Sequence, residues 1–488
     1  MWTSVRYFGV VITSVSILTA MIQDAPYEMS EILVTPWYSL YRSLSEPDTN
    51  KESCLLTELG DGYRDFFQKI QTDFAAFDEV NRSSVQPRQD ILEEIHMPLT
   101  HLVARRGFTL ETHNVSQSDG WTVSIHRIVV ASNETATPAP SASAEPALKS
   151  LMQNTKVPVL LPCFLLGSSP IWLVGDRNTS LAYILADSGF DVWLGNYRGN
   201  TLFSSYAGPN TFNESKWAFT VNDHALYDTP SQIDYILNVT GQPRLHIAGM
   251  SQGAISSIQM FSLRPEYQDK VISFASLAGA RTLASTDRIP FMKYIACLIA
   301  TQMDEDELLP WNENFASLAL GAENETLRLA ETLVGLTPNY INSHKLPLWI
   351  KYLPGGTSTW TLRYYYELWR PDAYVDSNMS RSPDALLVPT FDYGIHGNSR
   401  RFQSESPITM DARLIKVPTK LYFSSGDKYC TADENWKLLR LLPSNSTEHL
   451  FIDDANFSHF NFAINDHDPF VFYDVASFLS KFTTDSPP

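Results

Sequence analysis

The sequence predicts an α/β fold, in which a mostly parallel β-sheet is flanked by helices and a helical block is inserted before the last strands. Short, continuous apolar runs, typical of strands buried on both faces, alternate with helical stretches. A serine stands between two glycines where one such strand meets a helix. The alternation stops near residue 282 and resumes after residue 410, which predicts an insertion into the sheet-forming chain.

The first part of the sheet-forming core is expected to span residues 95–282. It opens with a β-hairpin, because two alternating segments flank the turn-forming pair Asp119-Gly120. In chain order, the expected strands are 108–115, 121–129, 157–161, 190–194, 244–248 and 271–277, and the expected helices are 179–188, 227–239 and 254–263.

Three further segments complete the predicted organisation. Residues 21–94 form an N-terminal extension with short helices expected at 62–80 and 90–96, and residues 131–148 form a loop rich in Ala, Pro, Ser and Thr. Residues 283–410, called the middle block below, are rich in helix-forming and aromatic residues and predict a cap over the sheet. The core resumes over 411–488, with strands at 420–424 and 448–452 and helices at 433–442 and 470–482.

The segment Gly249-Met250-Ser251-Gln252-Gly253 predicts a nucleophile elbow. A strand-like run precedes it and a helix-compatible run follows it, which is the context that this motif requires. Gly249 and Gly253 are needed because the turn is tight and a side chain would collide with neighbouring backbone. The strained turn presents the Ser251 hydroxyl to a base, so Ser251 is the expected nucleophile.

A nucleophilic serine requires a carboxylate that orients its base, and this acid is expected after the serine in the chain. Asp427 follows the strand 420–424, at the carboxyl edge of the sheet where the elbow also lies. Asp433, Asp453 and Asp454 are alternatives with less favourable positions. We therefore predict Asp427 as the acid.

Three histidines follow Asp427 and are candidates for the base. His449 stands at the start of a strand and so on the opposite edge of the sheet, and His467 precedes the last helix, where it is placed to cap that helix. His459 lies in the loop after the last strand, on the same edge as the elbow. We predict His459 as the base, with His467 as the alternative.

The oxyanion of a tetrahedral intermediate requires two preorganised N–H donors. The first is expected from the backbone of Gln252, the residue after the nucleophile. The second is expected from the turn Cys163-Phe164-Leu165-Leu166-Gly167, which follows an earlier strand of the same sheet.

Beyond the elbow, the chain resembles the acid lipases, a family of α/β-hydrolases that includes gastric and lysosomal lipases, over about residues 95–482. The segments that carry the resemblance are Ile125-His126-Arg127, Leu165-Leu166-Gly167-Ser168-Ser169, Asp191-Val192-Trp193-Leu194-Gly195-Asn196 with Arg198-Gly199-Asn200, Leu353-Pro354-Gly355-Gly356-Thr357-Ser358, Phe391-Asp392-Tyr393-Gly394 and His459. The resemblance implies hydrolysis of neutral-lipid esters by Ser251, Asp427 and His459 under a cap, at a lipid–water interface. It also implies Leu165 and Gln252 as oxyanion donors, and no metal or organic cofactor.

The chain departs from the family pattern at three places. Cys163-Phe164 stands where the family has His-Gly, Met250 replaces the histidine that usually precedes the serine, and His459-Phe460-Asn461-Phe462 replaces His-Leu-Asp-Phe. The first change lies in the turn that supplies an oxyanion donor. Two alternative functions therefore stay open: a lipid-binding homologue with impaired catalysis, and a carboxylesterase for short, soluble esters.

Composition excludes two classes of partner. The formal net charge is −18, and no run of Lys and Arg is longer than two residues. Nucleic acid is not an expected partner, since phosphate binding depends on clustered positive charge. Anchoring to anionic lipid through a basic patch is not expected for the same reason. Peripheral contact with lipid is what the resemblance to acid lipases implies.

The N-terminus and the sequons predict passage through the secretory pathway, to the extracellular space or the lysosome. Residues 1–20 resemble a signal peptide, because their apolar run is too short for a comfortable membrane span. An uncleaved anchor is the alternative. Ten of the 24 asparagines lie in N-x-S/T sequons and are glycosylation candidates: Asn81, Asn114, Asn133, Asn178, Asn213, Asn238, Asn324, Asn378, Asn445 and Asn456.

The four cysteines, Cys54, Cys163, Cys297 and Cys430, are too few for a disulfide scaffold and lack the spacing of a zinc site. One or two disulfides, or buried free thiols, are both compatible with their number. A bond between Cys163 and Cys430 is not expected, because their strands are predicted to lie too far apart in the sheet.

Overall fold

The computed structural model describes residues 69, 72–73, 89–130, 156–208, 215–283, 307–309, 320, 323–369 and 387–483. The predicted signal peptide, the loop 131–148, Cys54 and Cys297 lie outside these residues. So do most of the helix expected at 62–80 and the sequons of Asn81, Asn133, Asn213 and Asn378.

A nine-stranded, mixed sheet forms the centre of the molecule, with the order β1-β2-β4-β3-β6-β7-β12-β13 and β5 paired to β2. The strands are β1 (Phe108–Ser116), β2 (Trp121–Val130), β3 (Pro158–Leu161), β4 (Asp191–Leu194), β5 (Ser204–Tyr206), β6 (Leu245–Met250), β7 (Val271–Leu277), β12 (Thr419–Ser424) and β13 (Thr447–Ile452). From β4 to β13 all neighbours are parallel, whereas the β1–β2 hairpin and the β2–β4 pair are antiparallel. The predicted α/β fold with a mostly parallel sheet is therefore confirmed.

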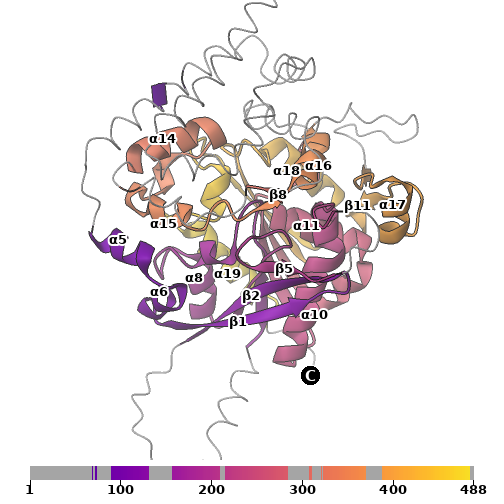
Figure 1. Cartoon of the computed structure of the whole chain (residues 1–488), viewed down its shortest axis with the longest axis horizontal. Coiled ribbons are helices and arrows are strands. Elements are labelled where there is room, and N and C mark those ends of the chain that lie inside the picture. The colour runs from indigo at the N-terminus through magenta and orange to yellow at the C-terminus, as the bar shows by residue number, and fades with distance from the viewer. Residues whose placement is uncertain are drawn as a thin grey trace, which may run out of the picture.

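Helices cover both faces of the sheet (Figure 1). On one face lie α8 (Leu181–Asp187) and α19 (Phe470–Ser480), and on the other lie α10 (Thr229–Thr240), α11 (Gln252–Leu263) and α18 (Ala432–Leu441). Strand β3 shows why its run is continuously apolar: Val159 and Leu161 enter the first layer, whereas Leu160 enters the second. Successive side chains on a strand point to opposite faces, so a strand covered on both sides needs apolar residues throughout.

The predicted strands and helices of the core are confirmed, with ends that move by a few residues. The largest difference precedes α10, where the expected helix 227–239 becomes α9 (Val221–Asp223), a π-helical segment (His224–Asp228) and then α10. The spacing of apolar residues does not predict the π-helical segment, because such a turn is set by the packing around it. Strand β6 runs to Met250, so the serine follows it directly.

The described part of the middle block contains α14 (Glu323–Val334), α15 (Leu346–Ile350), α16 (Thr359–Trp369) and α17 (Gly394–Phe402). In Figure 1 these helices form an arc along the upper side of the molecule, opposite the lower end of α10. Short strands also occur here, in two separate pairs: β8 (Glu307–Leu308) with β9 (Thr357–Ser358), and β10 (Leu387–Pro389) with β11 (Thr409–Asp411).

The helices α5 (Gln89–His96) and α6 (Leu99–Arg105) precede the sheet. Although α5 begins inside the expected N-terminal extension, its buried residues Ile91 and Ile95 both pack into the main core. The remaining short elements are 3-10 helices at Ser169–Trp172, Pro265–Lys270, Pro338–Tyr340, Ser343–Lys345, Ala412–Leu414 and His459–Phe462.

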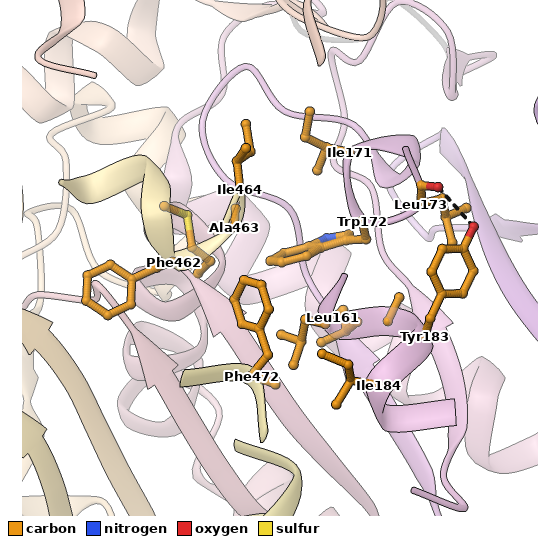
Figure 2. Close-up of a cluster of buried hydrophobic side chains, with 14 of the residues drawn as sticks. Leu161, Ile171, Trp172, Leu173, Tyr183, Ile184, Phe462, Ala463, Ile464 and Phe472 are labelled. Carbon is orange, nitrogen blue, oxygen red and sulfur yellow. Dashed lines mark hydrogen bonds between the residues drawn. The ribbon is translucent and has the colours of Figure 1, made fainter. Parts of the chain in front are cut away.

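One part of the core joins segments that are far apart in the sequence (Figure 2). Trp172 and Phe472 pack in one cluster with Leu161 and with Ala463 and Ile464. Leu161 ends β3, and Ala463 follows the 3-10 helix that begins at His459. The same apolar cluster therefore fixes two chain segments that lead to the carboxyl edge of the sheet.

Candidate active site

The nucleophile elbow adopts the strained geometry that its sequence predicts. Ser251 lies between β6 and α11 with φ 52° and ψ −118°, a conformation that is unfavourable for a residue with a side chain. A Cβ on Gly249 would lie 2.7 Å from the carbonyl carbon and oxygen of Gly253, and a Cβ on Gly253 would lie 2.7 Å from the carbonyl oxygen of Pro162. Both glycines are therefore required by close backbone approach.

A continuous chain of hydrogen bonds links the three predicted residues. His459 Nε2 lies 2.8 Å from Ser251 Oγ, and His459 Nδ1 lies 2.8 Å from Asp427 Oδ2. Asp427 Oδ1 accepts two backbone N–H bonds, from Tyr429 at 2.8 Å and from Cys430 at 3.0 Å. Because this carboxylate is fixed at both oxygens, it holds the imidazole in one orientation toward the serine.

The loop that carries His459 is anchored on both sides. Ser458 and Asn461 form a reciprocal capping box around the 3-10 helix, which fixes its first turn. The side chains of Phe457 and Phe462 are completely buried, and Tyr429 packs against the imidazole with ring centroids 5.0 Å apart. The imidazole is thus held by packing as well as by its hydrogen bonds.

The alternative residues lie elsewhere. His449 and His467 are exposed, and the hydrogen bonds to Ser251 and Asp427 come from His459 instead. Among the other carboxylates, Asp433 pairs with Lys437 on the surface of α18, and Asp454 accepts the hydroxyl of Tyr340. These contacts occupy both carboxylates away from the imidazole.

The predicted oxyanion turn is a β-turn, closed by the N–H of Gly167 donating to the carbonyl of Phe164 at 2.9 Å. Leu166, at the third position, has a positive φ of 61°, as in a type II turn. The turn does not use the N–H of Leu165, at its second position, for its own closure. Phe164 is buried and lies against Gly167, where a Cβ would come within 3.1 Å of its ring.

The middle block and the segment that contains Asn200 hold this turn by hydrogen bonds. Gly355 donates its N–H to the carbonyl of Leu166 at 2.6 Å, and Thr201 donates its N–H to the carbonyl of Gly355 at 2.8 Å. The amide of Asn200 donates to the carbonyl of Gly167 at 3.1 Å. The segments that contain Gly355 and Asn200 are among those that carry the resemblance to acid lipases. No pattern in the sequence indicates that they hold the turn containing Leu165.

The described residues contain no group of three or more His, Cys, Asp or Glu side chains that could hold a metal ion. Cys163 and Cys430 are both buried free thiols, so the pair that was not expected to form a disulfide does not form one. Burial raises the pKa of both thiols above the ordinary value of a cysteine, which keeps them protonated.

Gly253→Ala tests the contact between the elbow and the oxyanion turn. The added Cβ meets the backbone of Pro162 and Cys163, so one of the two segments must move. We expect a loss of about 1–3 kcal/mol in the free energy of unfolding, which is typical of overpacking, and a large loss of any Ser251-dependent activity. Urea unfolding and esterase assays measure the two effects.

Gly241→Ala is the matched control for this prediction. A Cβ on Gly241 meets nothing within 4 Å, although its φ is 69°. This variant should lose only about 1 kcal/mol through backbone strain and keep its activity. Equal behaviour of the two variants would contradict the proposed contact.

Comparison with known proteins agrees with this geometry. The chain is 28% identical over 389 residues to Lipase 1 of Drosophila melanogaster, an alignment that covers 79% of this chain and 80% of the relative. It is 26% identical over 405 residues to the tear acid lipase-like protein of Mesocricetus auratus, an alignment that covers 80% of this chain and 93% of the relative. It is also 26% identical over 397 residues to the gastric triacylglycerol lipase of Bos taurus, with coverage of 80% and 92%. These relatives confirm the resemblance to acid lipases.

The same fold is identified by comparison with protein families. The matched segment, residues 158–463, begins at β3 and ends just after His459. It thus includes the elbow, the acid and the candidate base. Because this segment makes up more than half of the chain, the protein belongs to the family described as the alpha/beta hydrolase fold.

Proposed function

We propose that this protein is a serine hydrolase that cleaves carboxylic esters of neutral lipids, such as triacylglycerols or sterol esters, through an acyl-enzyme. The observation that carries this proposal is the hydrogen-bonded series Ser251–His459–Asp427 at the carboxyl edge of the sheet. Similarity to lipases over about 80% of the chain supports the lipid ester as substrate.

In the proposed mechanism, Ser251 Oγ attacks the ester carbonyl while His459 Nε2 takes its proton. Asp427 stabilises the imidazolium, which then protonates the leaving alcohol. Water, activated by His459, attacks the acyl-enzyme and releases the fatty acid, and the proton returns to Ser251. The backbone N–H groups of Leu165 and Gln252 stabilise the oxyanion in both steps, and a donor of this kind is typically worth ~3 kcal/mol in the barrier.

An apolar environment beside the site supports a neutral acyl group as substrate. Leu165 and Tyr429 pack against a cluster of buried side chains that includes Ile255, Tyr365 and Cys430. This cluster combines residues of the core with residues of the middle block, which we propose to be a cap. Leu165 and Tyr429 are only partly buried, so a hydrocarbon chain that lies against them would gain favourable burial.

Two measurements test the proposal against its alternatives. A fluorophosphonate probe should label the purified protein but not its Ser251→Ala variant, whereas absence of labelling in the folded wild type would favour a lipid-binding homologue. Emulsified long-chain esters should be hydrolysed in preference to short, soluble esters. The opposite preference would favour a carboxylesterase.

We further propose that the protein passes through the secretory pathway and contacts lipid only peripherally, in the extracellular space or the lysosome. Every asparagine of the six described sequons is exposed, as glycosylation requires: Asn114, Asn178, Asn238, Asn324, Asn445 and Asn456. None of the helices in the described ranges combines the length and the apolar character needed to cross a bilayer. Mass spectrometry of protein secreted by a eukaryotic host, before and after removal of N-glycans, tests this proposal.

Three buried histidines predict that acid destabilises the fold. Burial lowers the pKa of His126 to about 4 and, together with Arg198 and Arg244 respectively, those of His224 and His246 to about 3. The unfolded chain, with pKa values near 6.5, takes up protons that the folded protein does not, so the stability falls as pH drops below that value. Each histidine contributes a loss of about 1.4 kcal/mol per pH unit until its folded pKa is reached.

The expected result is a free energy of unfolding in urea that decreases steadily between pH 6.5 and 4.5. His246→Gln should reduce this slope, because it removes one of the groups that bind protons only when unfolded. His449→Gln should not, because His449 is exposed in the folded protein. Stability that stays constant or increases over this range would contradict the prediction.

A further inference from the structure

We propose that Tyr365, a residue of the middle block, is a positioning residue for the oxyanion donor Gln252. The inference rests on the proposed function and deepens it, because it makes helix α16 part of the catalytic centre. The hydroxyl of Tyr365 donates to the side-chain carbonyl of Gln252 at 3.1 Å. The two residues are 113 positions apart, and both are buried, with exposed fractions of 4% and 3%.

Gln252 has two parts with separate tasks. Gln252 is the first residue of helix α11, so its backbone N–H has no acceptor within the helix and can donate to an oxyanion. Its side chain points into the interface with α16, where Tyr365 holds the amide oxygen. Fixing the side chain restrains rotation of the residue about its own backbone, and therefore the direction of the N–H. Catalytic geometry is sensitive to shifts of about 1 Å, so this restraint bears on the rate.

The environment of Tyr365 keeps this contact constant. The ring belongs to the same buried cluster as Cys430, whose own N–H donates to the acid Asp427. Burial raises the pKa of Tyr365 well above its ordinary value, so the hydroxyl stays protonated and donates throughout the working range of pH. The glutamine amide does not titrate. The pair is therefore a permanent link between α16 and the start of α11.

The neighbouring tyrosine on the same helix provides a matched control. Tyr364 is also buried, and its hydroxyl donates to the carbonyl of Pro389 at 3.0 Å, within the middle block. Tyr364→Phe and Tyr365→Phe each remove one buried hydroxyl and keep the ring. The two variants differ in the hydrogen-bond acceptor that loses its donor. In Tyr364→Phe it is the carbonyl of Pro389, and in Tyr365→Phe it is the side chain of Gln252.

The experiment measures kcat and KM on a soluble ester, the rate of phosphonylation by a fluorophosphonate, and Tm, for the wild type and both variants. Tyr365→Phe should lower kcat and the phosphonylation rate about tenfold, a fraction of the effect of removing a donor outright, and leave KM within about twofold. Tyr364→Phe should keep kcat, KM and the phosphonylation rate within about twofold of the wild type, even if its Tm falls as much as that of Tyr365→Phe.

A second variant keeps the inference open to refutation if Tyr365→Phe folds poorly. Gln252→Leu retains the backbone N–H but removes the acceptor of the Tyr365 hydroxyl, so it should lower kcat by a similar factor. Combining it with Tyr365→Phe should then cause little further loss. An active wild type in which Tyr365→Phe and Tyr364→Phe behave alike would overturn the inference alone. Absence of Ser251-dependent hydrolysis in the wild type would remove the proposed function and this inference with it.

Discussion

Ser251→Ala is expected to lower kcat for ester hydrolysis by about 10⁴-fold or more, since the nucleophile of a triad acts as a unit with its base. The methyl group leaves the elbow and the His459–Asp427 pair in place, because Ser251 is held by its backbone: its N–H donates to Leu277 and its carbonyl accepts from Ile255. Esterase assays and fluorophosphonate labelling of the folded variant measure the loss.

Ser262→Ala is a suitable control for this effect. Ser262 lies on the same helix, and its hydroxyl accepts the N–H of Asp411 rather than contacting His459. The control should retain activity and labelling. Substantial ester hydrolysis by Ser251→Ala would refute the assignment of the nucleophile, since the residual rate expected from binding and the oxyanion donors alone is small.

Asp427→Asn is expected to lower kcat by about 10⁴-fold with little effect on the fold. The side-chain oxygen can still accept the two backbone N–H groups of Tyr429 and Cys430. The amide nitrogen then faces His459 Nδ1 and donates to it, so the ring proton is forced onto Nε2. In that tautomer the imidazole cannot take the proton of Ser251.

The measurement for Asp427→Asn is kcat between pH 6 and 9, together with Tm. Asp433→Asn serves as the control, because Asp433 pairs with Lys437 on the surface of α18 rather than with the imidazole. Activity of Asp427→Asn within tenfold of the wild type would indicate that another carboxylate orients the imidazole.

Local patterns in the sequence predict the sheet, and they place Ser251, Asp427 and His459 at one edge of it, where the structure joins them by hydrogen bonds. Strands such as β3 and β7 were predictable because a strand covered on both faces must be apolar at every position. Asp427 and His459 were predictable because parallel strands end at one edge, so residues that follow different strands meet there. His449 could be set aside on the same ground, because it stands near the start of β13 and so at the opposite edge of the sheet.

The supporting contacts could not be predicted from such patterns. The bond between Tyr365 and Gln252 and that between Gly355 and Leu166 join segments whose separation in the sequence is large and carries no period. The π-helical segment that contains His224 is similar: its ring stacks on Tyr197 with centroids 4.4 Å apart, and neither feature follows from local propensity. These details depend on tertiary packing rather than on local sequence patterns.

The attachment of residues 353–369 to the core has a consequence for how the protein could be redesigned. Gly355 holds the oxyanion turn, Ser358 donates its hydroxyl to the carbonyl of Phe219, and Tyr365 holds Gln252. This stretch is a fixed wall beside the turn that contains Leu165 and the start of helix α11, although it is inserted in the chain like the rest of the block. A chimaera that borrows another relative's block to change the acyl preference should therefore splice outside this wall and leave it native.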